Sequence, residues 1–209
     1  MQSPTKQAYD ELQQAYDFFN LELFNDKLPH CLITMPKKRN FLGYFAKEQF
    51  KNSKGDITDE IAINPMYFSE RNIGETLSTL VHEMIHLWQK HYGKPGRVRY
   101  HNKQWADKME SLGLMPSSTQ RPGGRRTGDS MSHYIINDGP FHKAQAKLLS
   151  QGFIISWTDR YFDIERLIEG NKGKSNREKY TCSECGINAW GKPELSLICG
   201  KCNQPLIVN

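Results

Sequence analysis

Long apolar runs are missing from this sequence. No run approaches the roughly 20 residues that a membrane-spanning helix needs, which excludes a protein built on such helices. The first fourteen residues, MQSPTKQAYDELQQ, also lack the apolar core of a secretory signal. We therefore expect no membrane partner. We expect a cytoplasmic protein, or a nuclear or nucleoid-associated one where it binds DNA, and not a secreted one.

Cysteine is scarce, and its placement excludes a disulfide framework. Four of the five cysteines form two C-x-x-C pairs, Cys182 with Cys185 and Cys199 with Cys202. In a reducing compartment such pairs indicate metal binding. Thirteen residues separate the pairs, a spacing typical of a zinc ribbon, in which four thiolates hold one structural Zn²⁺. The 30-residue module 180–209 has too small a core to fold without that metal.

Acidic residues are scarce between positions 90 and 128. That stretch holds two of them against nine lysines and arginines, a local excess of +7. Such an excess favours a polyanionic partner, and nucleic acid is the usual one. We expect DNA to bind there. The ribbon is a second DNA-binding candidate, because Trp190 is available for stacking and basic residues precede the first cysteine: Lys172, Lys174, Arg177 and Lys179.

The chain does contain a His-Glu-x-x-His motif, formed by His82, Glu83 and His86. On a helix the two histidines lie four residues apart on one face, where neutral imidazoles can bind one Zn²⁺. Glu83 lies beside that face and can act on a water molecule without being a ligand. The opposite face of the helix is apolar: Leu77, Leu80, Val81, Met84, Ile85 and Trp88.

A catalytic zinc site needs a third protein ligand. The metzincin spacing fails here, because Tyr92 occupies the position of its third histidine. Two alternatives follow from the residues alone. Glu110, or less favourably Asp107, would make a glutamate-type site, and His101, just after a Gly/Pro loop, would make a three-histidine site.

Hydrophobic periodicity and breaker residues predict a mixed order of helices and strands. Helices are expected at residues 6–24, 73–91, 102–112 and 140–151, and strands at 31–35, 41–46, 57–64, 131–136 and 153–158. Asn72 is the expected N-cap of the second helix, and Gly43 marks a bulge or a close contact. The glycine- and arginine-rich stretch 117–130 is expected to be a mobile loop. These elements divide the chain into a core (1–115), a basic loop with a β-α-β extension (116–170), a linker (171–179) and the ribbon (180–209).

Residues 16–114 resemble the SprT-like (Spartan-type) family of zinc metalloproteases. The likeness is carried by Gly43-Tyr44-Phe45, by EIAINP at residues 60–65, by TLVHEMIH at 79–86 and by His101-Asn-Lys-Gln-Trp105. The resemblance implies that His101 is the third ligand of the catalytic zinc, because the family places a histidine after a glycine-containing loop. It also implies a zincin-like α+β core of helices around a three- to four-stranded sheet. The small α/β extension that follows is predicted from the residue pattern alone, and the zinc-ribbon module predicted from the cysteines agrees with the resemblance, because SprT-like proteins often carry one.

The implied function is zinc-dependent peptide hydrolysis with Glu83 as the general base, acting on proteins that are bound or crosslinked to DNA. Two zinc ions are expected, one catalytic and one structural. Two alternatives stay open: a nucleic-acid-binding zinc protein whose His-Glu-x-x-His site is catalytically idle, and a zinc hydrolase that acts on something other than peptides.

Overall fold

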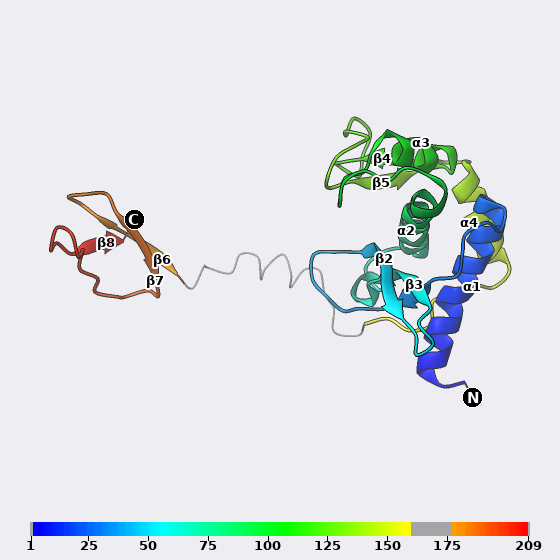
Figure 1. Cartoon of the computed structure of the whole chain (residues 1–209), viewed down its shortest axis with the longest axis horizontal. Helices are drawn as coiled ribbons and strands as arrows, with labels where there is room; N and C mark the ends of the chain where they lie inside the picture. Colours follow the sequence, from blue (N-terminus) through cyan, green and yellow to red (C-terminus); the bar gives the residue numbers. More distant parts are fainter. Residues whose placement is uncertain (1, 160–176, 209) are drawn as a thin grey trace. The chain divides into compact units, whose positions relative to one another are not determined.

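The computed structural model describes residues 2–159 and 177–208 (Figure 1). The chain divides into two compact units, Met1–Phe162 and Asp163–Asn209, and each is described by itself. Most of the expected linker, including Lys172 and Lys174, lies outside the described residues, as does the end of the expected extension. Among the described residues, no helix combines the length and the apolar character needed to cross a membrane.

Helix α1 (Pro4–Phe24) is amphipathic and provides one wall of the core. Its buried residues recur every three or four positions, as the sequence predicts. The helix ends at Asn25, which adopts a left-handed conformation with φ of 55°. The amide of Asn20 accepts a hydrogen bond from Leu28 N (3.0 Å) and donates one to Leu28 O (3.1 Å), which fastens the following turn to the helix. The buried residues of α1 are Leu12, Ala15, Tyr16, Phe19, Asn20, Leu23 and Phe24.

A three-stranded sheet with the order β1-β3-β2 lies next to this helix. Strand β1 (Leu32–Thr34) runs parallel to β3 (Ile57–Ile63), and β2 (Gly43–Lys51) pairs antiparallel with the other side of β3. The central strand is buried from residue 59 onwards, whereas β2 is an edge strand. A short 3-10 helix, η1 (Pro65–Tyr67), follows β3.

Helix α2 (Ile73–Tyr92) is the centre of the larger unit. The side chain of Asn72 accepts a hydrogen bond from Glu75 N (2.9 Å), so the predicted N-cap is confirmed. The helix packs against β2 and β3, against α1, and against α3 (Lys103–Ser111). Thirteen of its residues are buried, because neighbouring elements cover it on several sides.

The chain beyond α3 joins the same core. Strand β4 (Leu114–Ser117) pairs antiparallel with β5 (Ser132–Ile135), and α4 (Pro140–Ser150) lies beside α1, where Phe141 stacks on Phe19 at 5.5 Å between ring centroids (Figure 1). Strand β4 was not predicted from the sequence. It contains Pro116, which a two-stranded ladder tolerates because each strand has a free edge.

The strand predicted at residues 153–158 is wrong. Phe153 is buried, but residues 153–159 pair with no strand in the described chain. The segment instead runs beside α1, where Ser156 N donates to Glu11 (2.8 Å) and Trp157 Nε1 donates to Gln7 (3.1 Å). Its alternating apolar residues suit a strand, but a helix offers no ladder to pair with.

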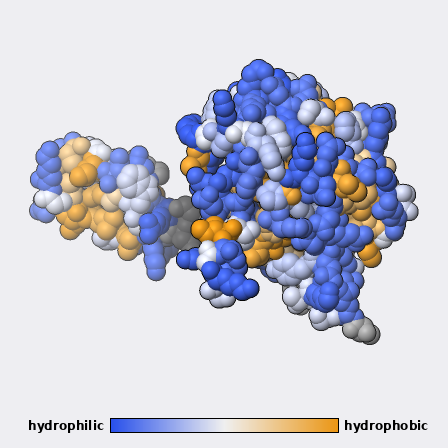
Figure 2. Space-filling model, turned by 45° about the vertical axis from the view of Figure 1, so that its right-hand side comes forward, coloured by the Kyte–Doolittle hydropathy of each residue, from blue (hydrophilic) through white to orange (hydrophobic). Residues whose placement is uncertain are grey.

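The second unit contains β6 (Glu178–Cys182), β7 (Asn188–Gly191) and β8 (Leu206–Val208), with the antiparallel order β7-β6-β8. Tyr180 is its buried centre, and its hydroxyl donates to Lys192 O (2.7 Å) and accepts from Leu195 N (3.1 Å). Figure 2 shows apolar side chains on the surface of this unit, and six large ones are exposed: Ile187, Trp190, Leu195, Ile198, Ile207 and Val208. Both units together confirm the predicted α+β class.

Candidate metal centres

Three histidines from two helical segments converge beside α2. His82 and His86 lie one helical turn apart on α2, and His101 immediately precedes Asn102, the N-cap of α3. One ring nitrogen of each lies within 4.8 Å of the others, and the Nε2 atoms of His86 and His101 are 3.1 Å apart. The structure thus brings together the three histidines that the resemblance implies.

Asn102 also joins α2 to α3. Its side-chain oxygen accepts hydrogen bonds from Trp105 N (3.0 Å) and from Gln89 Nε2 on α2 (2.8 Å). Trp105 itself is fully buried, with its ring 4.4 to 5.6 Å from the rings of the three histidines, measured between centroids. The indole therefore forms an apolar floor that limits how the imidazoles can turn.

The imidazoles of the cluster are held neutral. Burial lowers the pKa of His86 to about 3, and it lowers the pKa of His82 and of His101 as well. Neutral rings keep the lone pairs that a metal needs. Two nitrogens bound tetrahedrally to one zinc at about 2.05 Å lie about 3.3 Å apart, close to the spacing of the His86 and His101 Nε2 atoms. The residues present fit a zinc ion.

Glu83 lies in the same turn of α2 and is 5% exposed. Burial raises the pKa of its carboxyl group to about 8. Within the described residues it makes no hydrogen bond or ion pair. A buried acid without a structural partner is available for proton transfer.

Gly43 on β2 makes room for this carboxyl group. A Cβ atom at Gly43 would lie 2.9 Å from Ala62 O, 3.0 Å from a methyl carbon of Thr79 and 3.3 Å from Oε1 of Glu83. The close contact predicted for this glycine is confirmed, and it is a contact with the candidate base.

The second ring nitrogens of two of the histidines also have partners. Nδ1 of His82 lies 3.1 Å from Nδ1 of His133 on β5, and Nδ1 of His101 lies 3.1 Å from Gly128 O. Burial lowers the pKa of His133 to about 3, and the nearby Arg71 lowers it further. Sequence reasoning missed His133, because no spacing rule connects it with a residue 51 positions earlier.

The carboxylate alternative for the third ligand does not reach the cluster. Asp107 and Glu110 lie on the exposed side of α3, where Asp107 pairs with Lys103 (2.6 Å) and both acids pair with Arg126. The histidine arrangement is the one that the structure assembles.

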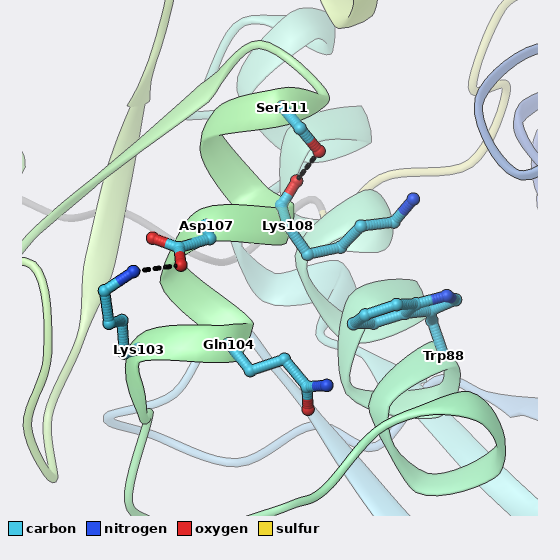
Figure 3. A pocket seen from close by; sticks show the side chains of 6 residues that line it. All are labelled: Trp88, Lys103, Gln104, Asp107, Lys108 and Ser111. Carbon is cyan, nitrogen blue, oxygen red and sulfur yellow. Dashed lines mark hydrogen bonds and ion pairs between the residues drawn. The ribbon is translucent and has the colours of Figure 1, made fainter.

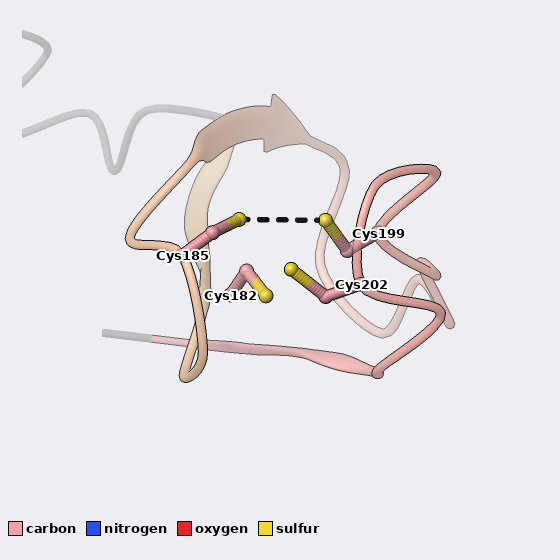
Figure 4. Close-up of side chains that lie close together, drawn as sticks. All are labelled: Cys182, Cys185, Cys199 and Cys202. Atoms are coloured by element: carbon pink, nitrogen blue, oxygen red, sulfur yellow. Dashed lines mark hydrogen bonds between the residues drawn. The ribbon is translucent and has the colours of Figure 1, made fainter.

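A second group of ligands lies in the ribbon (Figure 4). The sulfur atoms of Cys182, Cys185, Cys199 and Cys202 lie within 4.8 Å of one another, with 3.6 Å between those of Cys185 and Cys199. Four thiolates around one zinc at about 2.3 Å lie about 3.8 Å apart, so this donor set fits a tetrahedral site. Backbone N–H groups of Cys202 and Lys201 lower the pKa of Cys199, whereas the neighbouring thiol of Cys185 raises the pKa of Cys202, so the four sulfur atoms share their protons when no metal is bound.

Cys31, the remaining cysteine, is half-buried outside both groups, and burial raises the pKa of its thiol to about 12.

Two surface hollows lie outside these ligand sets. One, of about 470 Å³, is lined by α3 and by Trp88, with the ammonium group of Lys108 5.1 Å from the indole centroid (Figure 3). The other, of about 610 Å³, lies along residues 125–130 and Tyr100, next to the backbone that contacts His101.

Comparison with known proteins gives the following matches. A family model described as the SprT-like family matches residues 12–122. An uncharacterized protein in the mucB 3′ region of Salmonella typhimurium is 48% identical over 59 residues, which is 28% of this chain and 80% of that protein. No solved structure matches.

Proposed function

Because this chain belongs to the SprT-like family, we propose that it is a zinc-dependent metalloendopeptidase that cleaves proteins bound or crosslinked to DNA. One observation carries the proposal above all others. The partner-free carboxyl group of Glu83 lies beside three neutral imidazoles whose ring nitrogens converge within 4.8 Å.

His82, His86 and His101 would hold the catalytic zinc, and the four ribbon cysteines a structural one. A zinc ion in the histidine site supplies Lewis acidity, which polarises a carbonyl group and acidifies water. Glu83 takes a proton from the attacking water and delivers it to the leaving amine. Burial holds its pKa at about 8, and a neighbouring cation lowers that pKa towards the range in which a general base works best.

The edge strand β2 offers a place for an extended peptide. β2 pairs with β3 on one side only, and Gly43 at its start approaches Glu83. A substrate chain that adds to this edge binds through its main chain, so the side chains contribute little to selection. This mode suits an enzyme whose substrates share a location rather than a sequence.

Support for DNA comes from the cations of residues 90–128 that the fold leaves unpaired. Lys90, Arg97, Lys103 and Arg126 pair with acids, and Lys108 lies over aromatic rings. The other four make no side-chain hydrogen bond or ion pair within the described chain and are exposed: Lys94, Arg99, Arg121 and Arg125. Four phosphate contacts correspond to a slope of log K against log salt of roughly −3.6.

Replacing Glu83 by Gln tests the proteolysis directly. The substitution keeps the side-chain volume and removes the base, so cleavage of a DNA-bound protein is expected to fall by about 10²- to 10⁴-fold while zinc stays bound. Glu70→Gln, on an exposed side chain in the turn before α2, is the matched control and should cleave at the wild-type rate.

Unchanged cleavage by Glu83→Gln would refute the role of the base. A wild-type protein that binds zinc and DNA but cuts no protein would favour the idle-site alternative. The non-peptide zinc hydrolase would be favoured if the wild type hydrolysed an ester but cleaved no protein, and if Glu83→Gln abolished that ester hydrolysis.

A further inference from the structure

The region that follows the family match provides contacts to the proposed zinc ligands. The match ends at residue 122, whereas Gly128 and His133, which contact His101 and His82, lie beyond it. Both contacts involve Nδ1, and in His101 the other ring nitrogen, Nε2, faces His86. A partner at the second ring nitrogen of a metal-binding histidine fixes the tautomer and the orientation of the ring.

The contact to His82 is part of a directed chain of hydrogen bonds. Ser78 Oγ lies 2.9 Å from Glu75 O, and a carbonyl oxygen only accepts, so the serine hydroxyl donates to it. Ser78 Oγ therefore accepts from His133 Nε2 at 2.8 Å. A neutral His133 that donates from Nε2 accepts at Nδ1, so His82 donates from its Nδ1 at 3.1 Å. The chain leaves a lone pair on His82 Nε2.

The contact to His101 has the same consequence. Gly128 O accepts from His101 Nδ1 at 3.1 Å, which leaves a lone pair on Nε2, the atom that faces His86. The carbonyl is fixed by a two-way backbone bridge, with His101 N to Gly128 O at 2.9 Å and Gly128 N to His101 O at 3.1 Å. Gly128 has φ of 149°, a conformation that suits glycine.

Ion pairs fasten the loop that carries Gly128. Arg126 pairs with Asp107 and Glu110 on α3, and Asp129 pairs with Arg97 at 2.6 Å. β5 is held by its pairing with β4, where His133 lies opposite Pro116. The later part of the stretch 117–130, expected from its composition to be a mobile loop, is therefore attached to α3, to Arg97 and, through Gly128, to His101.

His86 provides an internal contrast. In the described part of the chain no hydrogen bond reaches its Nδ1, and its ring stacks on Phe45 at 6.5 Å between centroids with 13° between the planes. His86 is oriented by packing, whereas His82 and His101 are oriented by hydrogen bonds from the later segment.

We propose that His133 and the carbonyl group of Gly128 are positioning groups that fix the tautomer and ring orientation of His82 and His101 for metal binding. The inference rests on the proposed function, because it presumes a metal at the three histidines. The segment 123–135 is then part of the metal centre and not an appended loop.

The first test is the tautomer of each ring in the metal-free wild-type protein, read from the ¹⁵N shifts of labelled imidazoles. The hydrogen-bond chain predicts a proton on Nδ1 of His82 and of His101, and on Nε2 of His133. A proton on Nε2 of His82, or on Nδ1 of His133, would overturn the inference. This test needs no variant, so a folding failure cannot obscure it.

The second test is the zinc affinity of the histidine site in the full chain. It is measured in a titration with a chelator, with the same imidazole signals as the readout. His133→Leu removes the acceptor for His82 and is expected to weaken zinc binding by about 10- to 100-fold. His133→Asn places an amide oxygen near the position of Nδ1 and should restore binding to within about fivefold of the wild type. His142→Leu, on α4 outside the centre, is the matched control and should bind as the wild type does.

A folded His133→Leu protein with wild-type zinc affinity would overturn this inference and leave the proposed function intact. A wild-type protein that takes no zinc at the three histidines would overturn the proposed function and this inference with it. If His133→Leu does not fold, Ser78→Ala removes the far end of the chain and should weaken zinc binding by about three- to tenfold. Unchanged binding by Ser78→Ala would then count against the inference.

Discussion

The histidine centre and the cysteine centre are built on opposite principles. In the ribbon, four ligands lie within 21 residues, from Cys182 to Cys202, and Tyr180 is the one buried apolar side chain of the described residues there that is not itself a ligand candidate. In the larger unit, two candidate ligands lie on α2 and the third lies just before α3, and the apolar residues of these helices belong to an extensive core. On the proposed function, zinc would therefore organise the fold of the smaller unit, whereas in the larger unit the fold positions the candidate ligands without it.

Removal of metal should give the largest difference in folding between the two units. Without zinc the ribbon loses the interaction that organises it, since structural zinc contributes about 10–16 kcal/mol to comparable small modules. We expect a chelator to abolish the dispersed NMR signals of Tyr180 and Trp190 while those of Tyr16 and Trp105 persist, and added zinc to restore the former. If the ribbon kept its dispersed signals without metal, the proposed difference between the units would be wrong. It would also be wrong if the larger unit unfolded when zinc was removed.

A glycine-to-alanine substitution in each centre tests the difference between them. Gly43→Ala introduces a methyl group that meets backbone and the Glu83 carboxyl group, so the base is displaced. A misplacement of about 1 Å can cost about 10²-fold in rate, so for a shift of the carboxyl group by a few tenths of an ångström we expect kcat for protein cleavage to fall by roughly 3- to 10-fold. Gly200→Ala, next to Cys199, meets nothing within 4 Å and should leave both zinc content and cleavage unchanged. Equal effects of the two substitutions would contradict this account.

Ionised Glu83 should destabilise the metal-free larger unit. Its pKa is about 8 in the folded state and 4.5 ordinarily, so its ionisation opposes folding. The destabilisation is absent below pH 4.5 and grows as the pH rises to about 8. We expect Glu83→Gln to have a free energy of unfolding in urea that is higher than that of the wild type by roughly 3–5 kcal/mol at pH 8 and equal to it at pH 4.

Zinc loading narrows that difference, because a nearby cation lowers the pKa of the carboxyl group. A difference between Glu83→Gln and the wild type that does not change with pH would show that burial does not govern this group. The ribbon offers no acid of this kind for comparison among its described residues, where Glu178 is half-buried and Glu184 and Glu194 are exposed.

The removal of single positive charges should have the smallest effects, and these should appear in the salt dependence of DNA binding. Arg125→Ala removes one exposed, unpaired charge and should lower the salt slope of DNA binding by about 0.9. Lys103→Ala removes a charge already paired with Asp107 and should lower the slope by less. If charge removal at Lys192 or Lys201 in the ribbon changes the slope and Arg125→Ala does not, the DNA site belongs to the second unit.

The parts of the structure that depend on local sequence could be predicted. Asn72 caps α2, the four-residue spacing places His82 and His86 on one face, and the C-x-x-C pairs bring four sulfurs together. These features follow from helix geometry and turn chemistry within a few residues.

The parts that depend on contacts between distant segments could not be predicted. His133 reaches His82 only because β5 pairs with β4, and β4 contains Pro116, a residue that argues against a strand. The alternating residues from Phe153 to Trp157 predicted a strand, but no strand edge is available beside α1. Even the choice of His101 over Glu110 required the family resemblance, because spacing alone allowed both.

Counting zinc ions per chain by native mass spectrometry tests the central claim most directly. The account predicts two for the wild type, one for His101→Ala and one for Cys199→Ser, with Glu110→Ala retaining both. Two zinc ions in His101→Ala, or the loss of one in Glu110→Ala, would contradict the assignment of the catalytic centre to His82, His86 and His101.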